Sequence, residues 1–372
     1  MELEDIKQLA SIKPNNSLGI SLFLNINAKE RRHSDIATVL NHLIEEENKN
    51  LNLNHYEFKH FRENIEGIRN FFDANSFVQE ENRGIAIFSK TNIDLFEVFY
   101  LAQPIEDRIL YSQNFLIRPL VGYLDKYGKY LALLLDQSRG RFLEIEQGKI
   151  THYRYFRDEV PNKVKEGGWY GYEEHHIEKH VEDHLHQHYK KVAQQALVML
   201  KKYHYDWLII AGQPETLASF KKTLHSYAAE KLAAEVTVNL TKSPTDEVEN
   251  RMFESAKDVK HGQHENLTSE IMNKYPSKAA LGFNEVEKAL DRKAAYKLLL
   301  STNLAKTFPT CNSCNYQVHE QKICPKCHAD LSAMDQESNE LVRQALFQNC
   351  QIHFLENELI NRHDGIGALL RF

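Results

Sequence analysis

The sequence predicts an α/β protein built from three domains. The chain has 372 residues, which is more than a single domain usually holds. Short apolar runs typical of buried strands alternate with segments of helical period along its whole length. The composition, with 42% hydrophobic and 26% charged residues, is ordinary for a soluble globular protein. We expect domains over residues 1–125, 126–242 and 243–372.

The first domain is expected to be a small α/β unit. A buried strand over 18–24 leads into a charged loop and then a helix with apolar positions at Ile36, Val39, Leu40 and Leu43. A second helix is expected over 56–72, followed by strands over 84–88 and 94–99. The charged loop carries Arg31, Arg32 and His33, which are candidate RNA contacts; ordinary solvated surface charge is the commoner explanation for such a run.

The central domain should begin with a β-meander. A strand over 130–135 turns at Ser138-Arg139-Gly140 into a strand over 141–145, and the chain turns again at Gln147-Gly148. A polar loop and a long His-rich helix follow. The next apolar run, 207–211, ends at Gly212 and predicts a parallel strand with helices packed on its sheet.

The third domain contains two cysteine pairs, Cys311-x-x-Cys314 and Cys324-x-x-Cys327, with nine residues between the pairs. This spacing suits one tetrahedral Zn²⁺ ion held by four thiolates, a zinc ribbon over 311–327. Four thiolates leave no open coordination position, so the zinc is expected to be structural. Around the ribbon we expect helices over 284–290 and 341–347 and strands over 297–300 and 350–355. Cys350 falls in the last strand and should be a buried core thiol.

The His-rich helix carries His176, His180, His184 and His188 on one face, four residues apart. Histidines at this spacing can bind a metal, and Glu178, Glu182 and Asp183 are nearby. The sequence offers no matching ligand elsewhere. A solvated or RNA-facing polar surface is therefore the preferred interpretation, and a metal-dependent enzyme is the alternative of another class.

The loop before this helix contains Gly167, Gly168, Trp169 and Tyr170, preceded by Lys163 and Lys165. Paired glycines allow backbone conformations closed to other residues, and an exposed tryptophan ring favours a binding partner. A flexible surface loop with its tryptophan folded onto the body is the plainer alternative.

The order of these elements resembles the archaeal and eukaryotic class-one release factors and the related rescue factor Pelota. The strand-turn-strand, Gly167-Gly168 before a long helix, and the strand ending in Ala211-Gly212 match the family's central domain. The paired cysteines, the helix opening Phe283-Asn284-Glu285-Val286 and the glycine-rich tail 365–372 resemble its C-terminal domain. That domain has the α/β fold of a kink-turn-binding ribosomal protein. The first segment has no Asn-Ile-Lys-Ser motif, so the chain looks like the bacterial branch and most resembles a ribosome hibernation factor.

The resemblance implies a factor that occupies the vacant ribosomal A site, contacts 23S and 16S rRNA, and associates with EF-Tu or a similar translational GTPase. It implies no DNA or membrane partner. Trp169 stands where the release factors have the glutamine of their Gly-Gly-Gln loop, and an indole has one N–H donor and no carbonyl. We therefore expect a non-enzymatic factor that inhibits translation under stress. A ribosome rescue or peptide-release factor is the alternative.

Charge and composition also bear on nucleic-acid binding, membrane insertion and cellular location. The net charge of −6 argues against a uniformly basic nucleic-acid binder, although a local basic patch is enough to contact RNA. The sequence has no apolar run of about 18 residues, so no transmembrane helix is expected. The acidic start lacks a signal-peptide pattern, and the cysteine pairs suit a reducing compartment; both favour the cytoplasm.

Overall fold

The computed structural model describes residues 1–12, 18–51, 53–74, 82–157, 171–239, 245–302, 308–309, 326, 335–336, 339–356 and 362–372. The chain folds into two compact units. Residues 1–126 and 264–372 form what we call the two-ended unit, and residues 127–263 form the central unit. The mixed α/β class is confirmed, while the predicted boundaries at 125 and 242 stay a prediction.

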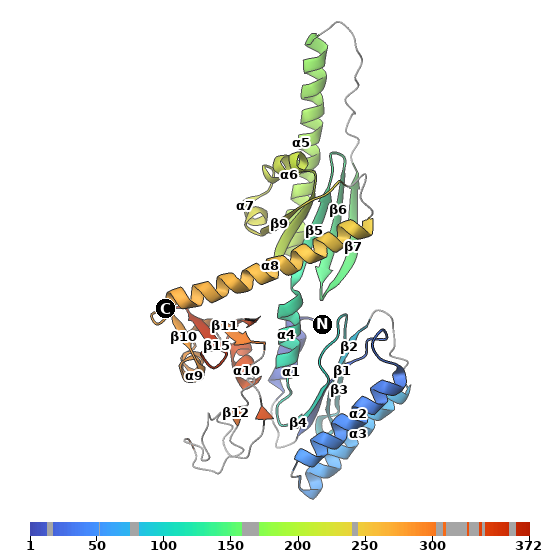
Figure 1. Ribbon diagram of the computed structural model, residues 1–372, viewed down its shortest axis with the longest axis vertical. Helices are drawn as coiled ribbons and strands as arrows, with labels where there is room; N and C mark the ends of the chain where they lie inside the picture. Colours follow the sequence, from blue (N-terminus) through green and yellow to red (C-terminus); the bar gives the residue numbers. More distant parts are fainter. Residues whose placement is uncertain are drawn as a thin grey trace. The chain divides into compact units, whose positions relative to one another are not determined.

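The two-ended unit begins with a four-stranded antiparallel sheet in the order β3-β2-β1-β4. Its strands are β1 (Gly19–Asn25), β2 (Gly84–Lys90), β3 (Leu95–Leu101) and β4 (Arg108–Ser112). The helices α2 (His33–Asn50) and α3 (His55–Ala74) cover one face of this sheet (Figure 1). These elements confirm the helices and the first three strands expected for this segment. Two further elements, β4 and α1 (Leu3–Ser11), were not expected from the sequence.

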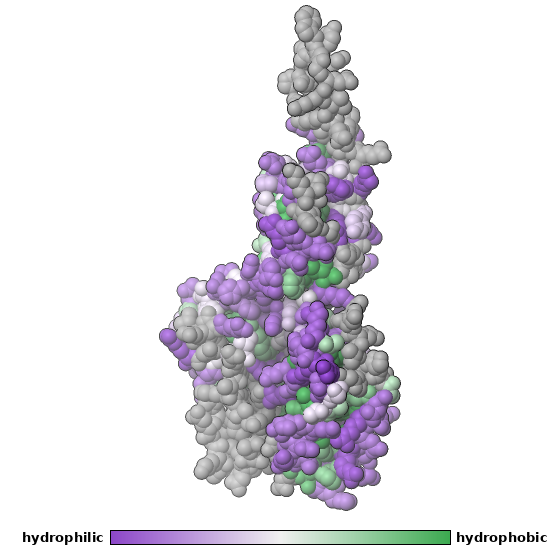
Figure 2. Space-filling view, turned by 45° about the vertical axis from the view of Figure 1, so that its right-hand side comes forward, coloured by the Kyte–Doolittle hydropathy of each residue, from purple (hydrophilic) through white to green (hydrophobic). Residues whose placement is uncertain are grey.

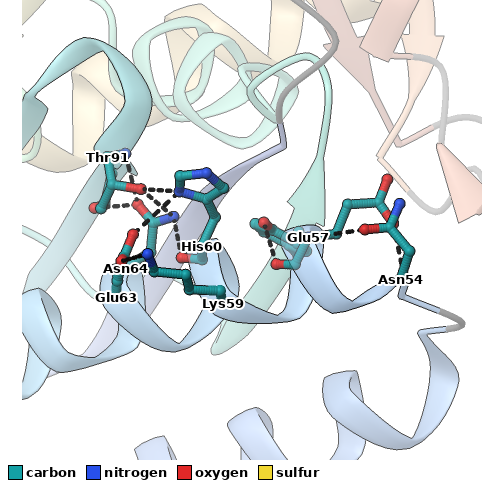
Figure 3. A network of polar contacts seen from close by, with 9 residues as sticks. Asn54, Glu57, Lys59, His60, Glu63, Asn64 and Thr91 are labelled. Atoms are coloured by element: carbon teal, nitrogen blue, oxygen red, sulfur yellow. Dashed lines mark hydrogen bonds and ion pairs between the residues drawn. The ribbon is translucent and has the colours of Figure 1, made fainter.

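A buried polar network attaches α3 to the end of β2 and the short helix η1 (Thr91–Ile93) (Figure 3). The Asn64 side chain is fully buried, donates to the His60 carbonyl at 2.7 Å, and accepts from the Ser89 hydroxyl at 2.7 Å and the Thr91 N–H at 3.2 Å. His60 Nδ1 lies 3.1 Å from the Thr91 hydroxyl. Because buried polar groups need partners, this set fixes the position of α3 along the sheet. At its start α3 is capped by Asn54 (Figure 3).

The central unit contains a five-stranded mixed sheet in the order β7-β6-β5-β8-β9. The strands are β5 (Lys129–Leu135), β6 (Arg139–Glu146), β7 (Lys149–Arg157), β8 (Trp207–Gly212) and β9 (Leu232–Thr237). β5, β6 and β7 form the predicted antiparallel meander, and β8 is parallel to β5, as expected. The turn between β6 and β7 has φ of 49° at Gln147 and 69° at Gly148. Positive φ at both central residues matches the twist of a two-residue hairpin.

Helices cover both faces of this sheet. The long helix α5 (Gly171–Lys202), with α6 (Pro214–Lys221) and α7 (Ser226–Glu230), packs on one face, around Leu133, Phe142 and Tyr189. On the other face, α8 (Thr245–Lys274) contributes Val248 and Met252 to the core. Figure 1 shows the beginning of α5 extending well past the sheet, and the described α5 residues that lie in the core, from Tyr189 on, belong to its later turns.

The C-terminal part of the two-ended unit has a second four-stranded sheet in the order β10-β15-β11-β14. It consists of β10 (Ala279–Leu281), β11 (Ala295–Ser301), β14 (Gln351–Leu355) and β15 (Ile366–Leu370), with α9 (Phe283–Asp291) and α10 (Asn339–Phe347). The helices and strands expected in this segment are confirmed. Two-residue strands, β12 (Phe308–Pro309) and β13 (Asp335–Gln336), pair with each other. The predicted core thiol is confirmed: Cys350 is buried and donates to the Ala295 carbonyl.

The two ends of the chain are joined through buried polar contacts. Asn339, the first residue of α10, is 1% exposed. Its side-chain oxygen accepts from the N–H groups of Ile117 (2.8 Å) and Arg118 (3.1 Å), and its amide donates to the Phe115 carbonyl (3.0 Å). It thereby caps α4 (Arg118–Tyr127) from a distant part of the sequence. Asp125 in α4 accepts from the Phe354 N–H of β14 at 2.8 Å.

The outer surface is consistent with the composition. Figure 2 shows hydrophilic residues over most of the visible described face, with small hydrophobic areas between them. Among the residues that the structure describes, no helix is both long and apolar enough to cross a membrane.

Candidate functional site

The candidate site is the junction between β7 and α5, because the Gly-Gly-Trp loop connects these two elements. β7 ends at Arg157 and α5 begins at Gly171. The loop residues Lys163, Lys165, Gly167, Gly168, Trp169 and Tyr170 lie outside the described residues. Their roles stay a prediction, and the structure defines the two elements from which the loop starts and ends.

The meander that leads to the loop is fixed by its first turn. The Asp136 carboxylate accepts from the N–H groups of Ser138 (2.8 Å) and Arg139 (2.7 Å), and its second oxygen pairs with the Arg139 guanidinium at 2.7 Å. An aspartate that bonds the backbone two and three residues ahead stabilises a tight turn. This turn sets the register of β6 against β5, and β6 in turn positions β7, the edge strand of the sheet.

The edge strand ends in a group of exposed cationic and aromatic side chains. Arg154 and Arg157 are exposed, and Tyr155 is 70% exposed. The Arg141 guanidinium lies 5.4 Å from the centre of the Tyr155 ring and forms an ion pair with Glu249 of α8 at 2.7 Å. The chain thus carries positive charge and an open aromatic ring directly before the loop.

The His-rich helix is confirmed as the helix α5, but its histidines do not form one solvent-facing row. His184 and His186 are exposed, whereas His188 is 1% exposed and lies beside the buried Tyr189, with ring centroids 5.8 Å apart. The prediction that all four histidines lie on a solvated face was therefore wrong for His188. The helix meets the sheet core at that turn, and the position four residues after His184 faces inward.

The described side chains of this helix do not support the hypothesis of a metal site. Within the part of the chain that the structure describes, no group of three or more His, Cys, Asp or Glu side chains could hold a metal ion. The side chains of His176 and His180 are outside that part. The same holds for Cys311, Cys314, Cys324 and Cys327, so the zinc ribbon also stays a prediction.

The charged loop after β1 is rigidly built. The Arg31 guanidinium pairs with Asp107 at 2.6 Å and donates to the Asn25 carbonyl at 3.2 Å. Hydrogen bonds from the Asn25 and Asn27 amides hold the pKa of the Glu30 carboxyl below its usual value. Arg31 thus has a structural partner.

The other two residues of the predicted contact lie at the start of α2. Arg32 is exposed, and its N–H donates to Asp35 at 2.9 Å. α2 begins at His33, whose side chain is outside the described part of the chain. Arg32 therefore offers its charge to solvent, whereas Arg31 is engaged within the protein.

Sequence reasoning missed the β7 side chains, although a signal was present. Residues 154–157 read Arg-Tyr-Phe-Arg, with cations and aromatic rings interleaved immediately before the glycine loop. That interleaving is typical of RNA-binding surfaces. Their exposure could not be deduced locally, because it depends on β7 being the edge strand.

Comparison with known proteins identifies a family segment. Residues 116–257 match the model of bacterial archaeo-eukaryotic release factor family 10. The matched segment contains α4, the five-stranded sheet, the loop and α5. The match confirms the release-factor resemblance for this part of the chain. None of the curated proteins matches the chain.

Solved structures of translation factors are similar at low sequence identity. Dom34 of S. cerevisiae, a translation termination-like factor that interacts with Hbs1, is 15% identical over 77% of this chain and 80% of its own, with a TM-score of 0.42. Archaeal Pelota, in a ribosome-bound complex with ABCE1, is 13% identical over 100% and 94%, with a TM-score of 0.43. The archaeal termination factor aRF1 is 16% identical over 100% and 99%, with a TM-score of 0.27. These scores do not establish a shared overall arrangement.

Proposed function

Because residues 116–257 match the bacterial archaeo-eukaryotic release factor family, we propose that this protein is a ribosome-binding translation factor. It occupies the vacant A site without reading mRNA and inhibits translation. The observation that carries the proposal is that the matched segment contains the β5-β6-β7 meander, the Gly-Gly-Trp loop and α5 in unbroken order.

The loop would contact 23S rRNA near the peptidyl transferase centre. Lys163 and Lys165 supply positive charge for phosphates, and Trp169 and Tyr170 supply rings for stacking on bases. At the decoding side, Arg32 and His33 would face 16S rRNA. Arg31 supports that loop through its ion pair with Asp107.

The tryptophan favours hibernation over peptide release. A glutamine side chain has both a donor and an acceptor, whereas the Trp169 indole has one donor and a large flat ring. Stacking of such a ring on an RNA base contributes about 1–3 kcal/mol to binding. The loop would thus bind the centre and exclude an aminoacyl-tRNA without assisting attack of water on an ester. The likeness to the bacterial hibernation factor Balon stays a prediction of the sequence.

The partners follow from the same proposal. EF-Tu or a similar translational GTPase would deliver the factor or bind beside it, through the C-terminal domain. One structural zinc per chain, held by the four paired cysteines, would stiffen that domain. The factor would act in the cytoplasm.

The test is co-sedimentation of purified protein with vacant 70S ribosomes, with and without mRNA, at several salt concentrations. We expect binding without mRNA, and we expect Trp169→Ala to weaken it about 5- to 140-fold, which is the stacking contribution expressed as affinity. Trp169→Phe, which keeps a ring, is the matched control and should stay near wild type. Absence of ribosome binding at every salt concentration would overturn the proposal.

A peptidyl-tRNA hydrolysis assay distinguishes a hibernation factor from a rescue or peptide-release factor. Wild type should release no peptide above background, and Trp169→Gln tests whether the family's glutamine alone restores release. Release by the wild type at a rate comparable to a release factor would replace hibernation with the rescue function.

A further inference from the structure

The edge strand that leads into the loop holds an open aromatic ring in a fixed place. Tyr155 is 70% exposed, yet its ring is backed by Arg141, whose guanidinium carbon is 5.4 Å from the ring centre. Arg141 is in turn fixed by Glu249 at 2.7 Å, and both of these side chains are only 16% exposed. A ring fixed on one side by a largely buried ion pair loses little conformational entropy when a second flat group stacks on it.

Cations surround this ring. In the β6–β7 pairing, Arg139 is opposite Arg157 and Arg141 is opposite Tyr155, so the four side chains share one face of the sheet. Arg139 is neutralised by Asp136. The Arg157 side chain is exposed to solvent, whereas Arg154, opposite Phe142, lies on the other face of the sheet.

We propose that Tyr155 is a stacking platform for an unpaired base of ribosomal RNA, and that Arg157, on the same face of the sheet, binds a phosphate next to that base. The proposal rests on the proposed function, because that function makes ribosomal RNA the ligand. Charge complementarity favours RNA: the patch combines the exposed Arg157 cation for a phosphate with a π face that any base can stack on. An acidic peptide would engage Arg157 but would leave the fixed ring without a use.

The patch lies at the root of the loop, since Arg157 is the last residue of β7. RNA bound there would extend the contact made by the loop onto the sheet of the central unit.

The experiment measures the affinity of Tyr155 and Arg157 variants for vacant 70S ribosomes across a salt series. Tyr155→Leu, which keeps apolar bulk and removes the ring, should weaken binding about 5- to 140-fold at all salt concentrations. Tyr155→Trp should bind as well as wild type or better. Arg157→Ala should lower the slope of log K against log salt by about one, as expected for one lost phosphate contact.

Matched controls are Tyr56→Ala and Arg62→Ala, both exposed positions on α3. These variants should stay within about twofold of wild type. If Arg62→Ala changes the salt slope as much as Arg157→Ala, or if Tyr155→Leu binds like wild type, the patch is not an RNA site. An unchanged far-UV circular dichroism spectrum and an unchanged urea unfolding midpoint check that each variant folds.

A crosslinking arm identifies the ligand class directly. With p-benzoylphenylalanine in place of Tyr155, irradiation of the ribosome complex should produce crosslinks to rRNA. Crosslinks to ribosomal protein alone would overturn the RNA assignment while leaving the proposed function intact. Failure of wild type to bind ribosomes would instead overturn the proposed function, and this inference with it.

Discussion

Replacing Asn339 with alanine is expected to destabilise the two-ended unit by about 3–5 kcal/mol. The side chain is 1% exposed and makes three hydrogen bonds to backbone groups of residues 115–118. Each buried group left without a partner costs about 1–3 kcal/mol, so three such groups set an upper range of about 3–9 kcal/mol. Water entering the space of the removed amide would satisfy part of this demand, which brings the expected value to the lower half.

The assay is urea unfolding followed by far-UV circular dichroism, with hydrogen exchange of the α4 amides as the local readout. Asn54→Ala is the matched control. Its oxygen also accepts two backbone N–H groups, from Tyr56 and Glu57 at 3.0 Å each, but it is exposed. Removal of an exposed helix cap costs about 1 kcal/mol. Both tryptophans, Trp169 and Trp207, belong to the central unit, so tryptophan fluorescence reports separately on that unit.

The difference between the two variants isolates the effect of burial. If Asn339→Ala costs no more than Asn54→Ala, burial does not raise the value of these hydrogen bonds, and the explanation of how the two ends of the chain are joined is wrong. Unchanged exchange in α4 would refute it in the same way.

Three further predictions concern charge, packing and metal. The pKa of the Glu270 carboxyl is held below its ordinary 4.5, first of all by a hydrogen bond from Lys274 at 2.6 Å. The ionised carboxylate therefore stabilises the folded state above pH 4.5, and this contribution is lost as the pH falls through the lowered pKa. Glu270→Gln should therefore be about 0.5–1 kcal/mol less stable than wild type at pH 7, and equally stable in strong acid by thermal unfolding. Gly212→Ala would place its Cβ against the carbonyl oxygen of Leu135 and should destabilise the central unit by about 1–3 kcal/mol. Gly262→Ala, with open space around it in a helix, should stabilise by about 1 kcal/mol in urea titrations. Elemental analysis should find about one zinc per chain, and Cys311→Ser should remove it; metal retained by that variant would contradict the ribbon.

Where turn residues and apolar runs coincide, the fold was predictable. The meander from β5 to β7 follows from two short turns between alternating or apolar segments. β9 was missed because its sequence, Leu-Ala-Ala-Glu-Val-Thr, begins with good helix formers, and pairing with β8 overrides that preference.

β15 was not predicted as a strand, because its segment reads as a glycine-rich tail, yet it lies between β10 and β11. Gly367 allows that position, since a Cβ there would lie 2.5 Å from the Ile271 side chain of α8. A close approach of this kind depends on a distant helix, and nothing in the local sequence indicates it.

In the candidate site, too, local sequence predicted the order of the elements but not the roles of individual side chains. Local order placed the glycine loop between a meander and a long helix, and the structure has these elements in that order. The roles of individual charges depend on partners far away in the sequence. Asp107 engages Arg31 and Glu249 engages Arg141, so neither arginine can be assigned from its neighbours alone.

The way the two-ended unit is assembled determines the order in which the chain can fold during its own synthesis. The central unit is continuous and can close once residue 263 has left the ribosome. The two-ended unit needs contacts such as Arg343 to the Ala10 carbonyl, which are separated by 333 residues and form late. Until α10 emerges, the N–H groups of Ile117 and Arg118 have no Asn339 to cap them. A nascent or truncated chain would therefore present the folded central unit before the rest of the factor is complete, and the two-ended unit is finished only when β15 takes its place between β10 and β11.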